Sequence, residues 1–361
     1  MYAMAWFVAP LLALLLLLVP AVAGPLGIQA VNDAQWTQRP AAKGRIAPIM
    51  IKAQVLLDRA RFSPGEIDGK SGENFSKALM AFTDHLELGS TGKLTEDAWQ
   101  KLVSTSSEPV LIEYTISDED VRGPFVQNIP KKMELMKDLP ALGYTSAREK
   151  LAENFHMSQD LLQTLNPGQK FDAAGQKIIV ANVKTGDLPA KATRIEVDKS
   201  AKILKVFGGN QRLLAVYPAT VGSQEKPAPS GQLTVTGVSK NPTYRYNPKY
   251  EFKGVRTNEP FTIKPGPNNP VGVVWIGLSR EGYGIHGTAD PSKVSKSESH
   301  GCIRLTNWDA LSLASVSAKG TVVNFSGKER ADRGATGRQA RRSKIAAAFP
   351  SLKEPLCLHR P

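Results

Sequence analysis

The sequence predicts a multidomain α+β protein in which two small modules precede a mainly-β C-terminal domain. The chain has 361 residues, which is enough for two or three domains. Apolar residues recur at helical spacing between residues 45 and 104. From residue 193 to 326 the pattern changes to short alternating strands separated by Gly- and Asn-containing turns. Such a pattern is typical of an antiparallel sheet packed as a sandwich or barrel.

The first 23 residues are predicted to be a secretory signal peptide. An apolar run with a leucine-rich centre ends at Ala21-Val22-Ala23, a small-x-small cleavage site before Gly24. The segment contains no Lys or Arg, and an apolar run of about 19 residues is long enough to remain as a membrane anchor, so an uncleaved anchor is the alternative. Residues 24–44 show little pattern and are predicted to be a linker.

Residues 45–104 are predicted to form a three-helix unit with a tight glycine-containing loop. The stretch IMIKAQVLLDRARF has apolar residues at helical spacing, and SPGEIDGKSG then interrupts the pattern. A second helix over residues 74–86 places four apolar side chains on one face. Thr95 precedes two acidic residues and is the expected N-cap of the third helix.

Residues 108–183 are predicted to form a second module with the order strand, helix, helix, strand. VLIEYTIS and QKIIV are rich in β-branched residues, and SAREKLAENFHMSQDLLQTL between them reads as two short helices. His156 falls on the apolar face of this helical stretch. We therefore expect it to be a packed structural histidine and not a ligand.

In the third module, residues 193–326, the strand YGIHG brings His286 to the start of a polar loop. A long aromatic segment over residues 242–266 is predicted to be a lid or a wall of a substrate groove, because long loops are often functional. Tyr246 of this segment is the expected substrate-contacting side chain. A short helix from residue 307 to 318 and the strand TVVNF close the domain.

The stretch from His286 to Arg304, HGTADPSKVSKSESHGCIR, concentrates the reactive residue types. His286 and Cys302 are sixteen residues apart, and the residues between them lack apolar periodicity, which indicates a loop. A thiol attacks an amide readily once a histidine takes its proton, so we expect Cys302 to be a nucleophile and His286 its base. Gly301 lets the backbone come close to a substrate, so its amide and that of Cys302 are the expected donors of an oxyanion hole.

Two further residues of this loop have expected roles. Ser299 is expected to brace the loop by hydrogen bonding. Arg304 has the planar fork that binds carboxylates bidentately, with a structural salt bridge as the alternative. A zinc site formed by His286, His300 and Cys302 is disfavoured, because no Glu stands at metalloprotease spacing. No metal or cofactor is expected.

IHGT followed by SHGCIRL resembles the motif of the YkuD family of L,D-transpeptidases, secreted bacterial enzymes that remodel peptidoglycan. PSG at 229–231 and PGPNNPVG at 265–272 extend the resemblance over the third module. The resemblance implies a mainly-β catalytic sandwich or barrel, with His286 as proton donor and acceptor. It also implies that the backbone carbonyl of Gly287 orients His286, and that His300 has a supporting role.

The resemblance implies a reaction as well as a fold. The cysteine takes the acyl group of a tetrapeptide stem after its diaminopimelate residue, with release of D-alanine. It then passes this group to an amine, forming 3-3 cross-links or anchoring an outer-membrane lipoprotein. The alternatives are an L,D-carboxypeptidase, in which water replaces the amine, and an inactive cell-wall-binding protein. The predicted signal peptide leads us to expect the protein in the periplasm, or on the inner membrane if the signal segment is not cleaved.

The two upstream modules resemble companions of cell-wall enzymes. FSPGEIDGKSGENFSKALMAF and GKLTEDAWQKL, within residues 45–104, resemble a small peptidoglycan-binding domain. LAENFHMSQDLLQTLNPG and GQKIIVANV, within residues 108–183, resemble a degenerate LysM repeat, which binds glycan. The expected partners are therefore the stem peptides and glycan of peptidoglycan, and the protein is expected to be a monomer.

The net charge of +13 is concentrated partly in a basic tail, residues 327–361. Nine Lys or Arg stand against three acids from residue 328 onward, with no interleaved stacking aromatics, so nucleic acid is not an expected partner. The tail is expected to be disordered. The two cysteines, Cys302 and Cys357, are expected to be free thiols, because a bridge would silence the nucleophile.

Overall fold

The computed structural model describes residues 26–38, 41–42, 44–89, 91–183, 188–223, 226–250, 255, 257–299 and 301–328. The predicted signal peptide, His300, Cys357 and the basic tail from residue 329 onward lie outside the described residues. Within those ranges no helix has the length and apolar character needed to cross a membrane.

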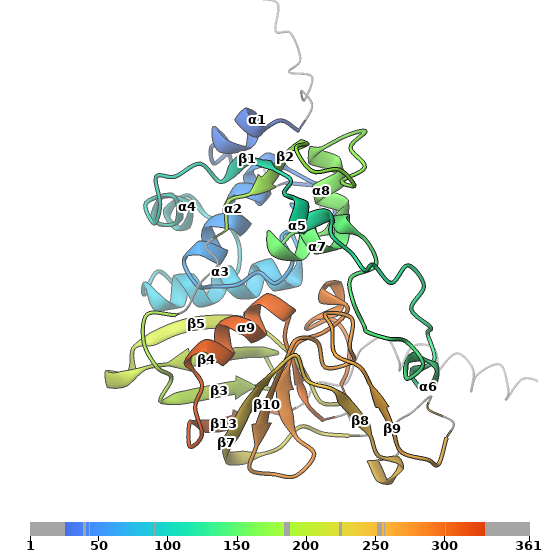
Figure 1. Cartoon of the computed structure of the whole chain (residues 1–361). Helices are drawn as coiled ribbons and strands as arrows, with labels where there is room; N and C mark the ends of the chain where they lie inside the picture. Colours follow the sequence, from blue (N-terminus) through green and yellow to red (C-terminus); the bar gives the residue numbers. More distant parts are fainter. Residues whose placement is uncertain are drawn as a thin grey trace, which may run out of the picture.

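The N-terminal part of the chain consists of short helices around a two-stranded antiparallel sheet (Figure 1). The elements are α1 (Ile28–Asn32), α2 (Pro48–Arg59), α3 (Glu73–His85), α4 (Glu96–Val103), β1 (Leu111–Thr115), α5 (Asp118–Val121), α6 (Met133–Met136), α7 (Ala147–Asn154), α8 (Gln159–Leu165) and β2 (Lys177–Ala181). The three helices predicted between residues 45 and 104 are α2, α3 and α4. The Thr95 side chain caps α4 by accepting a hydrogen bond from the Ala98 N–H, as predicted.

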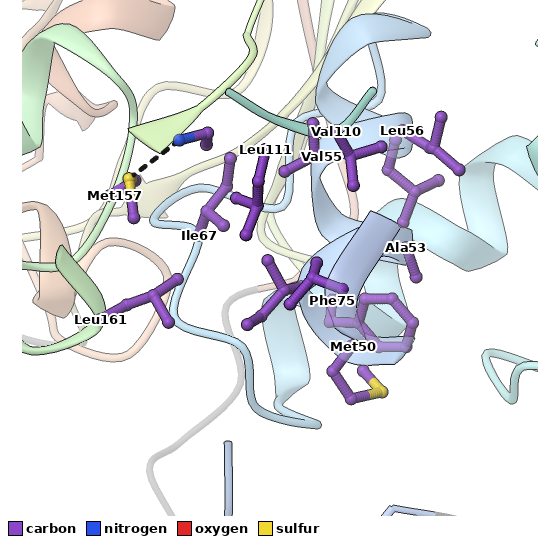
Figure 2. Close-up of a cluster of buried hydrophobic side chains, with 14 of the residues drawn as sticks. Met50, Ala53, Val55, Leu56, Ile67, Phe75, Val110, Leu111, Met157 and Leu161 are labelled. Carbon is purple, nitrogen blue, oxygen red and sulfur yellow. Dashed lines mark hydrogen bonds between the residues drawn. The ribbon is translucent and has the colours of Figure 1, made fainter. Parts of the chain in front are cut away.

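One hydrophobic core runs through both predicted N-terminal modules. Figure 2 shows side chains from both of them in the same cluster, among them Phe75, Leu111 and Leu161. The residues predicted to be a linker contribute as well, because Val31 of α1 is fully buried and Asn32 bonds the backbone of β1. The segment upstream of α2 therefore includes a docked helix, which its weak sequence pattern did not reveal.

The C-terminal part is a nine-stranded sheet that carries one longer helix within its described residues. Its strands and helix are β3 (Arg194–Asp198), β4 (Ile203–Phe207), β5 (Leu213–Pro218), β6 (Thr220–Val221), β7 (Gly231–Lys240), β10 (Val274–Leu278), β11 (Gly284–His286), β12 (Ile303–Arg304), α9 (Asn307–Val316) and β13 (Val322–Ser326). A separate two-stranded hairpin, β8 (Tyr244–Tyr246) and β9 (Phe261–Ile263), projects from it.

The large sheet curls into a nearly closed barrel. Its strand order is β5-β4-β3-β13-β7-β10-β11-β12-β6, so β5 and β6 are the two edges. Only Ala219 separates β5 from β6 in the chain, which requires the two edges to lie next to each other. The long strand β7 spans the curl, because its first half pairs with β13 and its second half with β10. The predicted mainly-β sandwich or barrel is thus a nearly closed barrel.

Burial alternates along the strands of this region, as in β3 and β4. In β4 the buried residues are Leu204 and Val206, whereas Ile203, Lys205 and Phe207 are half-exposed. The stretch ILKVF has apolar residues on both faces, so its period of two does not say which face is inward.

The N-terminal part packs on one end of the barrel, over α9 and β5 (Figure 1). The His156 ring stacks on Trp308 of α9 at a centroid distance of 5.1 Å, and its Nδ1 lies 3.1 Å from Asp58 Oδ1. Ser63 donates a hydrogen bond to Asp309 of α9 at 3.0 Å. His156 is thus packed between α2 and α9, in line with the structural role expected from its position on an apolar face.

Candidate active site

The two ends of the reactive loop lie on neighbouring strands. His286 ends β11 and Cys302 directly precedes β12, and these strands pair in parallel with His286 opposite Arg304. Side chains alternate along a strand, so Cys302 points to the same face as Arg304 and His286. The sixteen-residue loop therefore returns its thiol to the face of the sheet that carries the imidazole.

His286 is buried and held in one orientation. Its Nδ1 lies 2.6 Å from the carbonyl oxygen of Gly287, and its ring stacks on Trp275 of the adjacent strand β10 at 5.7 Å between centroids. Because a carbonyl only accepts, Nδ1 carries the proton and Nε2 is left as the basic nitrogen. Burial and the positive charge of Arg304 lower the pKa of His286 to about 3, so the imidazole is neutral at neutral pH.

Cys302 is partly exposed and free of any disulfide within the described residues. Its Sγ lies 3.6 Å from the Gly282 carbonyl oxygen. Burial raises the pKa of the thiol, while a backbone hydrogen bond from Gly284 and the charge of Arg304 act in the opposite direction. In the free protein the pair is thus a neutral thiol beside a neutral imidazole.

The turn before Cys302 is fixed by Ser299 and Gly301. Ser299 is buried, and its hydroxyl donates to the Cys302 carbonyl at 2.5 Å. Gly301 has a φ of 99°, and a Cβ at this position would lie 2.9 Å from the Tyr283 ring. Both backbone conformation and space therefore require glycine here. His300, between these residues, lies outside the described part of the chain.

Arg304 places a positive charge near both His286 and Cys302. Its Nε is buried and has no hydrogen-bond partner within the described residues. Burial lowers its pKa, although the neighbouring Cys302 and Asp290 favour the charged form. A buried guanidinium donor without an acceptor can bind an incoming anion.

The β8–β9 hairpin brings a tyrosine near the thiol. Tyr246, predicted to contact substrate, is buried and stacks on Phe261 at a centroid distance of 4.7 Å. Tyr244 is the residue that interacts electrostatically with Cys302, and burial together with this interaction raises the pKa of its hydroxyl. The sequence placed Tyr244 only within the predicted lid; its interaction with Cys302 depends on where β8 lies in the fold. The role of Tyr246 stays a prediction.

The side chain of Asn307 holds the start of the loop that follows His286. Asn307, the first residue of α9, accepts hydrogen bonds through Oδ1 from the Thr288 N–H at 3.1 Å and the Val273 N–H at 3.3 Å. Sequence reasoning did not single out Asn307, because it reads there as the first residue of an ordinary helix. Among the described residues no group of three or more His, Cys, Asp or Glu side chains is arranged to hold a metal ion.

Comparison with known proteins gives one consistent family. The family model for the L,D-transpeptidase catalytic domain, YkuD, matches residues 192–325. The putative L,D-transpeptidase YkuD of Bacillus licheniformis is 31% identical over 180 residues, which cover 49% of this chain and 92% of that protein. The protein of the same name from Bacillus subtilis is 31% identical over 179 residues, which cover 48% of this chain and 90% of that protein. The probable L,D-transpeptidase YbiS of Escherichia coli K12 is 26% identical over 189 residues, which cover 51% of this chain and 61% of that protein.

Proposed function

Since the chain belongs to the YkuD family of L,D-transpeptidase enzymes, we propose that it transfers acyl groups between peptidoglycan stem peptides through Cys302. The observation that carries the proposal is the pairing of β11 with β12, which puts the thiol on the face of the oriented neutral imidazole of His286. A neutral imidazole with a free Nε2 can accept a proton, which a general base must do.

In the first step the Cys302 sulfur attacks the carbonyl carbon of the diaminopimelate residue in a tetrapeptide stem. The thiol proton passes to His286 Nε2 as the C–S bond forms. The C–N bond to the terminal D-alanine then breaks, and the imidazolium returns the proton to the leaving amine. The product is a thioester on Cys302 and free D-alanine.

In the second step an acceptor amine attacks the thioester. The amine loses a proton to His286, the new C–N bond forms, and the C–S bond breaks. The proton returns to the sulfur and restores the thiol. With the side-chain amine of another stem as acceptor the product is a 3-3 cross-link; with a lysine of an outer-membrane lipoprotein it is an anchored lipoprotein. Water as acceptor would make the enzyme an L,D-carboxypeptidase.

Backbone donors are proposed to stabilise the negative oxygen that forms in both steps. The amides of Gly301 and Cys302 are the candidates for this oxyanion hole, with Ser299 and His300 supporting the turn. The support for this role is the fixed backbone at Gly301 and the short Ser299 hydrogen bond to the Cys302 carbonyl.

Arg304 is proposed to bind a carboxylate of the donor stem. The buried Nε without a partner supports this assignment, because a guanidinium donor left without an acceptor costs free energy until an acceptor arrives. The position of Arg304 beside Cys302 on the same face puts that carboxylate near the reacting carbonyl.

The N-terminal part is proposed to hold the enzyme against its polymer. Residues 45–104 are assigned as a peptidoglycan-binding-like unit and residues 108–183 as a LysM-like unit, on their sequence resemblance. The predicted signal segment, residues 1–23, leads to a proposed periplasmic location after cleavage, with an inner-membrane anchor as the alternative. An inactive cell-wall-binding protein is the competing proposal for the whole chain.

The proposed function is tested with purified muropeptides. The full chain is incubated with a tetrapeptide donor and a stem acceptor, and the products are followed by mass spectrometry. We expect loss of D-alanine and a cross-linked product with the parent enzyme, and neither with Cys302→Ala. Meropenem should add covalently to Cys302. The variant Cys357→Ser removes the other thiol of the chain, and it should still form the adduct. Cross-linking by Cys302→Ala at the parent rate would overturn the proposal, and tripeptide without cross-link would favour the carboxypeptidase.

A further inference from the structure

We propose that Glu153 of α7 is a positioning residue for His286. It acts through Asn307, at the start of α9, and through the peptide group that joins Gly287 to Thr288. Glu153 lies outside residues 192–325, the range that the catalytic family model matches. The inference rests on the proposed role of His286 as the base.

The peptide group between Gly287 and Thr288 carries one hydrogen bond at each end. Its carbonyl oxygen accepts from His286 Nδ1 at 2.6 Å, and its N–H donates to Asn307 Oδ1 at 3.1 Å. Hydrogen bonds in such a chain polarise one another, so the bond to Asn307 makes the carbonyl a better acceptor for the imidazole. The same two bonds fix the plane of the peptide group and, with it, the direction of the ring.

The amide of Asn307 has no freedom to rotate away. Its Nδ2 donates to the two carboxyl oxygens of Glu153 at 3.1 and 3.3 Å and to the Pro267 carbonyl at 3.2 Å. These acceptors define which side of the amide is nitrogen, and therefore which side presents oxygen to Thr288. A Cβ at Gly287 would lie only 2.3 Å from Asn307 Oδ1, so the amide is in close contact with the loop.

Glu153 is a neutral acceptor at the centre of this arrangement. Burial raises its pKa to about 8, with Glu149 and Glu66 acting in the same direction, while hydrogen bonds from Asn307 and Tyr144 act against the shift. At neutral pH the carboxyl is mainly protonated and still offers its oxygens to the Asn307 amide. Glutamine has nearly the same shape and keeps one such oxygen.

Glu149 offers a matched control one helical turn earlier on α7. It is also buried, and its Oε1 accepts from Asn268 Nδ2 at 2.9 Å, so it ties α7 to the barrel as Glu153 does. No hydrogen bond joins it to Asn307 among the described residues. Removal of Glu149 weakens the same junction but takes away none of the hydrogen bonds that Asn307 makes to Glu153, Pro267, Val273 and Thr288.

The test uses the full chain with Cys357→Ser, so that Cys302 is its single thiol. Two rates are measured for Glu153→Ala, Glu153→Gln and Glu149→Ala: alkylation of the thiol by iodoacetamide across pH 6 to 9, and kcat and KM for D-alanine release. We expect Glu153→Ala to lower kcat about tenfold, or ~1.4 kcal/mol, with KM little changed. Its alkylation at neutral pH should slow as well. Glu153→Gln should stay within about twofold of the parent, as should Glu149→Ala despite a lower melting temperature.

Each outcome decides the proposal. Equal losses of kcat in Glu153→Ala and Glu149→Ala would overturn it, because Glu153 would then only hold the junction together. An unchanged Glu153→Ala enzyme would also overturn it. If Glu153→Ala does not fold, Glu153→Met fills the space without an acceptor and is expected to show the same loss. A failure of the proposed function itself is separate, since it would appear as D-alanine release by Cys302→Ala.

Discussion

The stability of the protein should fall as pH rises from 5 to 8, and Glu153 should account for a defined part of the fall. The carboxyl has a pKa of about 8 in the folded protein against an ordinary value of 4.5. In the unfolded chain it releases its proton near the ordinary value, whereas in the folded protein it keeps the proton. Its contribution to stability is therefore complete below pH 4.5 and is lost as pH rises through the folded pKa.

The magnitude follows from the linkage between protonation and folding. One proton bound by the folded protein and not by the unfolded chain changes the free energy of unfolding by about 1.4 kcal/mol for each pH unit. Between pH 5 and pH 8 the loss is on the order of 4 kcal/mol. The groups that face this carboxyl are Glu149, Glu66, Tyr144 and Asn307. The two acidic ones raise its pKa further, and the hydrogen bonds from the other two lower it.

The assay compares the parent protein with Glu153→Gln, which cannot titrate at this position. Urea-induced unfolding is followed by tryptophan fluorescence at pH 5, 6, 7 and 8, and the difference in free energy between the two proteins is taken at each pH. Other buried acids, such as Asp309 with its pKa of about 7, titrate in both proteins and cancel in the difference. A difference that stays constant from pH 5 to 8 would refute the reasoning.

Three further predictions concern the loop and its neighbours. Gly287→Ala should lower D-alanine release at least tenfold and destabilise the protein by about 1–3 kcal/mol in thermal unfolding, because the new Cβ would overlap Asn307 Oδ1; a parent-like melting curve and rate would contradict this. Alkylation of Cys302 by iodoacetamide should accelerate steadily from pH 6 to 9, since its pKa is raised and the pKa of His286 is too low for a resting ion pair; a rate independent of pH would indicate a preformed thiolate. Arg304→Lys should raise KM for the tetrapeptide about tenfold through loss of bidentate binding, and an unchanged KM would remove Arg304 from the substrate site.

The sequence predicted the secondary structure well where the pattern is local. Helices α2, α3 and α4 and strands β1, β2 and β13 lie where periodicity, caps and β-branched runs indicated. The expected pairing of His286 with Cys302 rests on residue chemistry and stays a prediction. The helices and strands depend on interactions between residues close in the chain. Cys302 and His286 stand out because the chain has only two cysteines and five histidines.

The interactions that the sequence did not reveal are between distant residues. Glu153 appears in the sequence as one polar residue of a short helix, yet in the fold its carboxyl contacts an amide 154 residues later. The direction of the pKa shift of Cys302 could not be predicted either, because it depends on how deeply the fold buries the thiol. Likewise α1 has too few apolar residues to show a period, and its burial depends on β1 and α2.

In the proposed mechanism, the neutral state of Cys302 and His286 is the reason why the orientation of the imidazole matters. A thiolate and an imidazolium attract each other, and that attraction helps to hold a charged pair in register. Burial keeps both groups neutral here, so no attraction between opposite charges directs His286 toward Cys302 before substrate binds. Orientation must then come from directional contacts: the hydrogen bond to Gly287 and the stack on Trp275. In the proposed mechanism, an amide that holds the Gly287 peptide group, and a carboxyl that holds this amide, therefore bear directly on the rate of proton transfer.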